Sequence, residues 1–227
     1  MSETKAAGGQ ERGLERERIV ETALELLAEV GFSGLTLRRL AARLGVQAAA
    51  LYWYFKNKQD LIDAMATRII TSEFRAVPPA AADWRALLTH VARTNRRALL
   101  RYHDGAQILA HANMPQQPVM LKGLEQLLRR LARQGFSTEL SMSSFFIIIR
   151  FTLGCVFEEQ ADPRSSATRA GQHAYIQQLA KVYPTVAEGF KVSMAQRQHN
   201  PDWHFERGLE IILAGIQTQL DAGVQPA

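Results

Sequence analysis

The chain repeats apolar side chains at intervals of three and four residues over most of its length, and no segment alternates convincingly as a strand would. The first clear example places Ile19, Ala23, Leu26 and Val30 on one face of a helix. Gly31 follows directly, and glycine commonly ends a helix. The pattern predicts an all-α protein.

Two short helices are expected next, separated by a tight connection. Thr36 is placed to cap a helix that stops at Gly45, and a second helix is expected over residues 48–55. Two short helices joined by a turn that contains glycine are typical of a helix-turn-helix. Residues 14–60 are therefore predicted to form a small three-helix unit.

The rest of the chain is predicted to be a larger helical body at residues 61–221, with flexible ends at 1–13 and 222–227. Asn57 is placed to cap its first helix, and further helices are expected at 84–102, 103–112, 119–135, 138–160 and 203–220. Loops are expected at 76–83, 113–118 and 161–171. The middle of 138–160 is apolar on nearly every side and needs covering on every side.

Charge points to a partner for the small unit. The 227-residue chain has a formal net charge of +5 and a pI of about 9.6, which is compatible with a polyanion. No acidic residue lies between Thr36 and Lys58, whereas that segment holds the basic residues Arg38, Arg39, Arg43, Lys56 and Lys58. Such a segment suits phosphate contacts on double-stranded DNA, although solvated arginines on a three-helix core would have the same pattern.

Four consecutive aromatic residues, at 52–55, follow the second short helix's first turn. At about 100° per residue, Leu51 and Phe55 face inward, whereas Trp53 faces outward with Tyr52 and Tyr54 beside it. Exposed aromatic rings next to arginines are expected to be covered by a partner.

Cysteine content and hydropathy limit the other classes. A single cysteine, Cys155, excludes an internal disulfide and fits a reducing cytoplasm, where it is expected to be a small buried side chain. The apolar run FFIII, residues 145–149, is far shorter than a membrane span, so no membrane partner is predicted. No catalytic carboxylate pair, metal-ligand quartet or phosphate loop is seen, so neither an enzyme nor a cofactor is predicted.

Residues 16–63 resemble the DNA-binding domain of the TetR family of bacterial repressors. The resemblance rests on TALELLAEVGFSGLTLRRLAARLGV at 22–46 and on LYWYFKNKQDL at 51–61, a pattern highly specific to the family. It continues into the tetracycline-repressor branch through RRALLRYHDGAQ at 96–107 and FTLGCVFEEQ at 151–160. It implies an all-α fold, with an N-terminal helix-turn-helix DNA-binding domain and a larger ligand-binding and dimerisation domain.

The resemblance also implies DNA-binding roles. Phosphate contacts fall to Thr36, Lys58 and either Tyr52 or Trp53, and a guanine edge falls to Arg38. The full implied DNA-contacting set is Thr36, Arg38, Gln47, Ala48, Ala49, Ala50, Tyr52, Trp53, Tyr54 and Lys58. Relatives carry polar residues where this chain has three alanines, so direct readout is expected to depend on Arg38, Gln47 and Tyr52. A homodimer would bind an operator with inverted half-sites.

The same resemblance implies a small-molecule inducer site in the body. The corresponding positions are Phe74, Val91, Asn95, Leu109, Asn113, Arg150, Phe151 and Glu158. Relatives that bind tetracycline with magnesium have histidine in place of Phe74 and Leu109. We therefore expect a ligand-responsive repressor whose inducer is not tetracycline–Mg²⁺, the alternative being a tetracycline-responsive repressor.

Two features of the body are left open by the sequence. Arg150 lies in an apolar helix. It is interpreted either as part of a salt bridge, with Glu158 or with another residue at an interface, or as an anchor for an acidic or carbonyl-bearing ligand. His103, Asp104 and His111 could suggest a metal, but Gly105 makes their alignment on one helix face doubtful, so no metal site is predicted.

Overall fold

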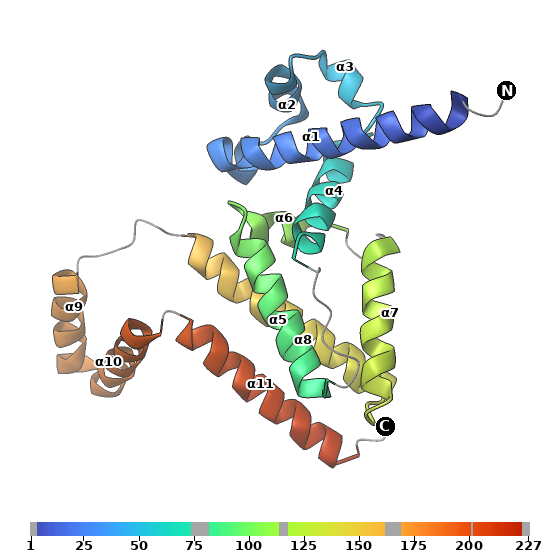
Figure 1. Ribbon diagram of the computed structural model, residues 1–227. Coiled ribbons are helices and arrows are strands. Elements are labelled where there is room, and N and C mark those ends of the chain that lie inside the picture. Colours follow the sequence, from blue (N-terminus) through green and yellow to red (C-terminus); the bar gives the residue numbers. More distant parts are fainter. Residues whose placement is uncertain (1–3, 74–81, 114–117, 162–168, 201, 224–227) are drawn as a thin grey trace.

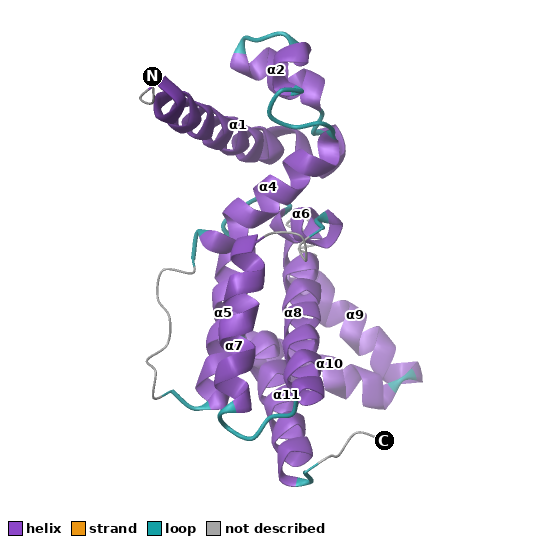
Figure 2. Cartoon of the chain, turned by 90° about the vertical axis from the view of Figure 1, so that its right-hand side faces the viewer, coloured by secondary structure: helices purple, strands orange, loops and turns teal. Residues whose placement is uncertain are grey.

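The computed structural model describes residues 4–73, 82–113, 118–161, 169–200 and 202–223. Eleven helices, α1 to α11, occupy these residues, and no strand is found among them. A small head of α1, α2 and α3 stands at one end of the molecule, and α4 joins it to a larger helical body (Figure 1; Figure 2). The predicted all-α fold with an N-terminal helix-turn-helix is confirmed.

The head follows the predicted helix ends with two exceptions: α1 begins at Thr4, inside the segment 1–13 that was expected to be flexible, and α3 ends early. α1, Thr4–Gly34, is interrupted by a left-handed Gly31 at φ 67°, and α2, Leu37–Leu44, ends at a left-handed Gly45 at φ 69°. The Thr36 hydroxyl accepts a hydrogen bond from the Arg39 amide at 3.2 Å, as an N-cap should. α3 is shorter than expected, Ala48–Leu51, because residues 52–54 form turns.

α4, Lys58–Thr71, begins beside the head and runs into the body. The Asn57 side chain caps it by accepting from the Asp60 amide at 2.9 Å, and the Asp60 carboxylate accepts from the Lys56 amide at 2.9 Å. These reciprocal bonds fix where the helix starts. α4 therefore provides a direct mechanical connection between the two parts.

The body is built around α5, Trp84–Leu100, and α8, Thr138–Ala161, which pack along each other. α6, Gly105–His111, covers the end of this pair nearest the head, and α7, Pro118–Ala132, and α11, Trp203–Asp221, pack against α8 (Figure 2). Asp83 caps α5 through the Ala86 amide at 2.7 Å. The predicted helices at these positions are all found.

The sequence analysis did not predict two further helices. α9, Arg169–Val182, and α10, Pro184–His199, pair with each other and lie apart from α5 at one side of the body (Figure 1). The loop expected at 161–171 is therefore wrong at its end, because residues 169–171 already belong to α9, while residues 162–168 lie outside the described part.

The apolar core is continuous between head and body. One cluster of buried side chains joins Leu27, Leu40 and Phe55 of the head to Ile69 of α4 and Val156 of α8. A second cluster fills the body between α5, α7, α8 and α11, and Cys155 packs against it half-buried. Movement of α4 is therefore coupled to the head through shared packing.

By length and composition alone, residues Thr138–Gln160 of α8 could cross a membrane. The apolar stretch is therefore longer than the FFIII run alone indicated. One face of the helix packs against α5, α7 and α11. Its outer face carries exposed Phe146, Ile147 and Phe157.

Candidate nucleic-acid interface and ligand cavity

The outward face of the head presents aromatic and basic side chains together. Trp53 is 91% exposed and Tyr52 55%, whereas Phe55, two residues beyond Trp53, is 1% exposed. The Phe55 amide donates to the Leu51 carbonyl at 2.9 Å, so the turn after α3 keeps helix-like geometry. Tyr54 was expected outside with its neighbours, but it is half-buried and packs against the core.

The five basic side chains between residues 36 and 58 differ in whether other groups of the head already bind them. Arg43 makes two hydrogen bonds to Glu29, at 2.8 and 2.7 Å, which raise the pKa of its guanidinium, and Arg39 donates to the Gly34 carbonyl at 2.9 Å. Among the described residues, exposed Arg38 makes no ion pair or side-chain hydrogen bond. Arg38 is therefore the arginine of α2 that is available to a partner.

Lys58 is partly held by the head itself. Its Nζ lies 5.1 Å from the centre of the Phe32 ring, and the residue is half-buried. Exposed Lys56 comes just before it. The remaining predicted DNA-contacting residues are Thr36, Gln47, Ala49 and Ala50, which are exposed, and Ala48, which is half-buried.

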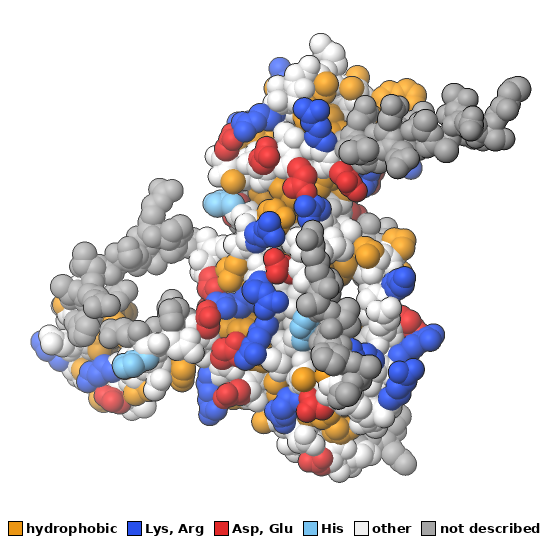
Figure 3. All heavy atoms as spheres, in the orientation of Figure 1, with side chains coloured by type: hydrophobic (Ala, Val, Ile, Leu, Met, Phe, Trp, Pro, Cys, Tyr) orange, Lys and Arg blue, Asp and Glu red, His pale blue; other side chains and the backbone are white. Residues whose placement is uncertain are grey.

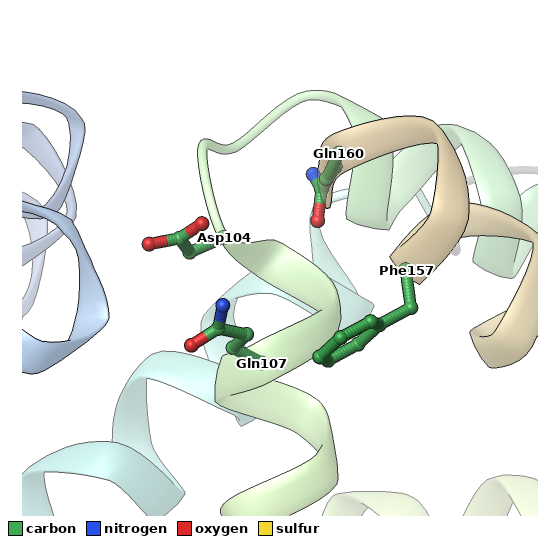
Figure 4. Close-up of a pocket in the computed structure, with 4 residues that line it drawn as sticks. All are labelled: Asp104, Gln107, Phe157 and Gln160. Atoms are coloured by element: carbon green, nitrogen blue, oxygen red, sulfur yellow. The ribbon is translucent and has the colours of Figure 1, made fainter. Parts of the chain in front are cut away.

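A polar junction ties the head to α6 and α8. Asp104, at a left-handed φ of 53°, accepts a hydrogen bond from the Phe32 amide at 2.7 Å. In Figure 4 its carboxylate points toward the head, beside a small cleft of about 20 Å³ also lined by Gln107, Phe157 and Gln160. The Gln160 amide donates to the Tyr102 carbonyl at 2.8 Å and accepts from the Ala106 amide at 3.1 Å.

A second junction connects α4 to the end of α6. The carboxylate of Asp63, 8% exposed, accepts hydrogen bonds from the Gln59 side chain and from the Asn113 amide, both at 2.8 Å. Gln59 also donates to the His111 carbonyl at 2.7 Å. Asn113, a predicted ligand residue, thus serves here as a backbone donor to α4.

A cavity of about 270 Å³ lies in the body between α4, α5, α7 and α8. Its described lining is mainly apolar and consists of Thr71, Val91, Asn95, Val119, Met120, Lys122, Gly123, Leu124, Gln126, Leu127, Phe145 and Ile149. Thr71 brings the last turn of α4 into the cavity wall. A ligand here would contact the helix that leads to the head.

The predicted ligand residues are only partly brought together. Val91 and Asn95 line the cavity, whereas Leu109 packs against the core shared with the head. Phe151 stacks on Phe205 of α11, with ring centres 5.6 Å apart. Phe74 lies outside the described residues.

Arg150 and Glu158 are exposed and are not among the cavity-lining residues. The Arg150 guanidinium lies 5.2 Å from the centre of the Phe146 ring, on the outer face of α8. No ion pair joins Arg150 to Glu158 in the described part of the chain.

Sequence reasoning missed the contribution of α7. Seven of the lining residues belong to this helix, and none of them was among the predicted ligand residues. The structure leaves Val119 and Leu121 of α7 exposed, which fits a role beyond that of a core helix.

These features together define an all-helical DNA-binding regulator with a separate ligand cavity. The N-terminal part, residues 19–65, matches the family model for bacterial regulatory proteins of the tetR family. Residues 77–220 match the model for the tetracyclin repressor-like C-terminal domain. The chain belongs to the TetR family.

Individual relatives support the same assignment. The chain is 41% identical over 205 residues to the tetracycline repressor protein class C of Escherichia coli, covering 90% of this chain and 91% of that protein. A possible TetR family transcriptional regulator from Streptomyces coelicolor A3(2) has a TM-score of 0.74 at 34% identity, with 89% and 98% covered. BioQ, solved with its double-stranded DNA operator, has a TM-score of 0.61 at 26% identity, with 88% and 96% covered.

Proposed function

We propose that this chain is a cytoplasmic repressor that binds an operator as a homodimer and is released by a small molecule other than tetracycline–Mg²⁺. The observation that carries the DNA-binding part is the outward pairing of Trp53 with unengaged Arg38. A tryptophan 91% exposed on a three-helix head is costly to leave in water unless a partner covers it.

Each exposed group of the head suits a different part of the DNA. Arg38 carries a free guanidinium fork, which matches the two acceptors of a guanine in the major groove. Ala49 and Ala50 are exposed, and alanine offers only apolar contact, for which a thymine methyl is the best partner. Tyr52 and Trp53 flank this surface and suit contacts to the sugar-phosphate backbone.

A homodimer is supported by the outer surfaces of α8 and α11. Phe146, Ile147, Phe157 and Ile211 are between 40% and 60% exposed. Packing two such surfaces across a two-fold axis would cover the outer side of α8, which its own chain leaves open. The BioQ regulator bound to its operator provides a precedent for DNA binding in this fold.

Release by a ligand is proposed to act through α4. This helix carries Lys58 at the head and Thr71 at the cavity, and its Asp63 is bonded to the end of α6. A ligand that binds better when α4 is displaced would shift the population toward heads spaced wrongly for DNA. The shared apolar core would transmit the displacement.

The lining of the cavity argues against a tetracycline–Mg²⁺ chelate, although the class C relative is named a tetracycline repressor. Magnesium prefers oxygen ligands in octahedral geometry. Leu109, at the position where the resemblance implies a ligating histidine, is half-buried and packs against the core. The polar residues of the described lining are Thr71, Asn95, Lys122 and Gln126.

Selection of bound duplexes from a random DNA library tests the proposal. We expect an inverted repeat whose half-sites lie roughly 34–36 Å apart, or a multiple of that distance. Light scattering of the free protein should give twice the chain mass of 25.4 kDa. A library that returns no preferred sequence, or a sequence without two-fold symmetry, would refute the operator claim.

A further inference from the structure

The inner wall of the 270 Å³ cavity offers a hydrogen-bond acceptor without a donor. Asn95 is 4% exposed, and its Nδ2 donates to the Val91 carbonyl at 2.8 Å. This bond fixes the orientation of the amide, because a carbonyl accepts from the NH₂ end and repels the oxygen. Asn95 Oδ1 is therefore left for another partner.

No other described residue donates to Asn95 Oδ1. The fully enclosed and unpaired side-chain atoms of the described residues are the hydroxyls of Ser141, Ser144 and Thr152. Asn95 Oδ1 is not one of them, so it keeps access to the cavity that Asn95 lines. A ligand that covers this oxygen without supplying a donor leaves it unpaired, so a ligand that supplies a donor is favoured over one that does not.

Two further residues refine the polarity of the site. Thr71 donates its hydroxyl hydrogen to the Thr67 carbonyl at 2.7 Å, so only its lone pairs remain for a ligand. Lys122 is exposed where it lines the cavity, and its ammonium group makes no ion pair among the described residues. The inner wall thus accepts hydrogen bonds, and the rim carries a positive charge.

The volume sets the size of the apolar part. A cavity of about 150 Å³ lined by apolar side chains holds benzene. At about 270 Å³, this cavity has room for two fused aromatic rings. Its walls include Leu127, Phe145 and Ile149, which suit such a body.

We infer that the inducer belongs to the class of compact aromatic hydroxy acids. Its hydroxyl donates to Asn95 Oδ1, its rings fill the space between α5, α7 and α8, and its carboxylate faces Lys122 at the rim. The inference rests on the proposed function, because it names the ligand class of the same regulatory site.

Three matched probes test, on the unaltered protein, whether the hydroxyl group of the ligand is needed as a hydrogen-bond donor. The probes are 6-hydroxy-2-naphthoic acid, 6-methoxy-2-naphthoic acid and 2-naphthoic acid, since the methoxy group keeps the oxygen and loses the donor. We expect the hydroxy acid to bind, and to release the selected operator, at about fivefold lower concentration than the other two. Calorimetry gives the affinities and fluorescence anisotropy follows the DNA.

Two variants test the residues. Asn95→Leu should remove the preference for the hydroxy acid over the methoxy acid. Lys122→Met should weaken binding of the acids and leave binding of neutral 2-naphthol unchanged. Lys181→Met, at an exposed lysine of α9, should behave as the unaltered protein. Thermal melting of each variant without probe establishes that it is folded.

The outcomes separate the two proposals. Equal affinity for the hydroxy and methoxy acids, or no binding of any naphthalene probe, would overturn the ligand class. Calorimetry reports this result without DNA. Failure of the protein to bind any duplex before a probe is added would instead count against the regulator function.

Discussion

The polar side chains that are proposed to bind partners face solvent in the head and an internal cavity in the body. In the head, Arg38 and Trp53 face solvent, while Arg43 is paired inside the unit with Glu29. In the body, Asn95 is buried and turned toward an apolar cavity. A surface that reads a large, rigid polymer must be exposed, whereas a site for a small molecule must be enclosed.

The two regions nevertheless share one layer of packing. Leu40 and Phe55 of the head belong to the same buried cluster as Ile69 of α4 and Ala98 of α5. The head is therefore not a unit hung on a flexible linker. This arrangement allows a change of less than a helical turn in α4 to be felt at the outward face.

The strongest test of the comparison replaces two aromatic neighbours in the head. Phe55→Ala should lower the free energy of unfolding by about 3–5 kcal/mol, because Phe55 is 1% exposed. Trp53→Ala should change it by less than about 0.5 kcal/mol, because Trp53 is 91% exposed. Urea unfolding measures both. A large loss in Trp53→Ala would place that ring in the core.

A second test concerns the ionic groups of the body. The Arg96 side chain is 14% exposed and joins Glu159 at 3.0 Å and Asp202 at 2.7 Å. Acidic and basic side chains interleave over the body in the view of Figure 3. The Arg96 guanidinium also lies 4.8 Å from the centre of the Phe205 ring. Arg96→Ala should cost about 2 kcal/mol of unfolding free energy.

Arg93→Ala is the matched control for Arg96→Ala. Arg93 pairs with Glu206 at 2.8 Å, but its side chain is 52% exposed. An exposed ion pair contributes at most about 1 kcal/mol, and salt screens it. Equal losses in the two variants would mean that burial does not distinguish the two ion pairs.

Much of this comparison could be predicted from the sequence where the signal is local. Thr36, Gly45 and Asn57 mark helix ends through bonds to residues only three or four positions away. The inward position of Phe55 was predicted from helical spacing. It holds although α3 ends at Leu51, because the following turn continues the helical hydrogen bonding.

Non-local partners could not be predicted in the same way. Glu29 and Arg43 are 14 positions apart on different helices, so the pairing that removes Arg43 from the free basic set depends on how α1 and α2 cross. Lys58 and the Phe32 ring meet for the same reason. The lining of the cavity by α7 depends on the packing of four helices, which periodicity does not specify.

A third test compares two arginines of α2. Arg38→Ala should lower affinity about 10- to 100-fold for each half-site and relax the preference at one base pair of each half-site. Arg43→Ala should keep the sequence preference, because Arg43 is occupied by Glu29. Gel-shift titration against single-base operator variants measures both effects. An unchanged preference in Arg38→Ala would contradict the proposed role.

The smallest expected effect concerns Lys58, which lies between head and body. Its ammonium group sits over the Phe32 ring and is half-buried, so it either contacts a phosphate or only holds the head against α4. If it contacts a phosphate, Lys58→Ala removes one phosphate contact from each half-site of the dimer, so the fall of log affinity with log salt becomes shallower by about two units. Lys181→Ala, at an exposed lysine of α9 away from the head, should leave the slope unchanged. We expect the salt dependence of Lys58→Ala to be shallower, because the cation–π contact leaves the other side of the ammonium group free to donate. An unchanged salt dependence together with a lower melting temperature would assign Lys58 to packing alone.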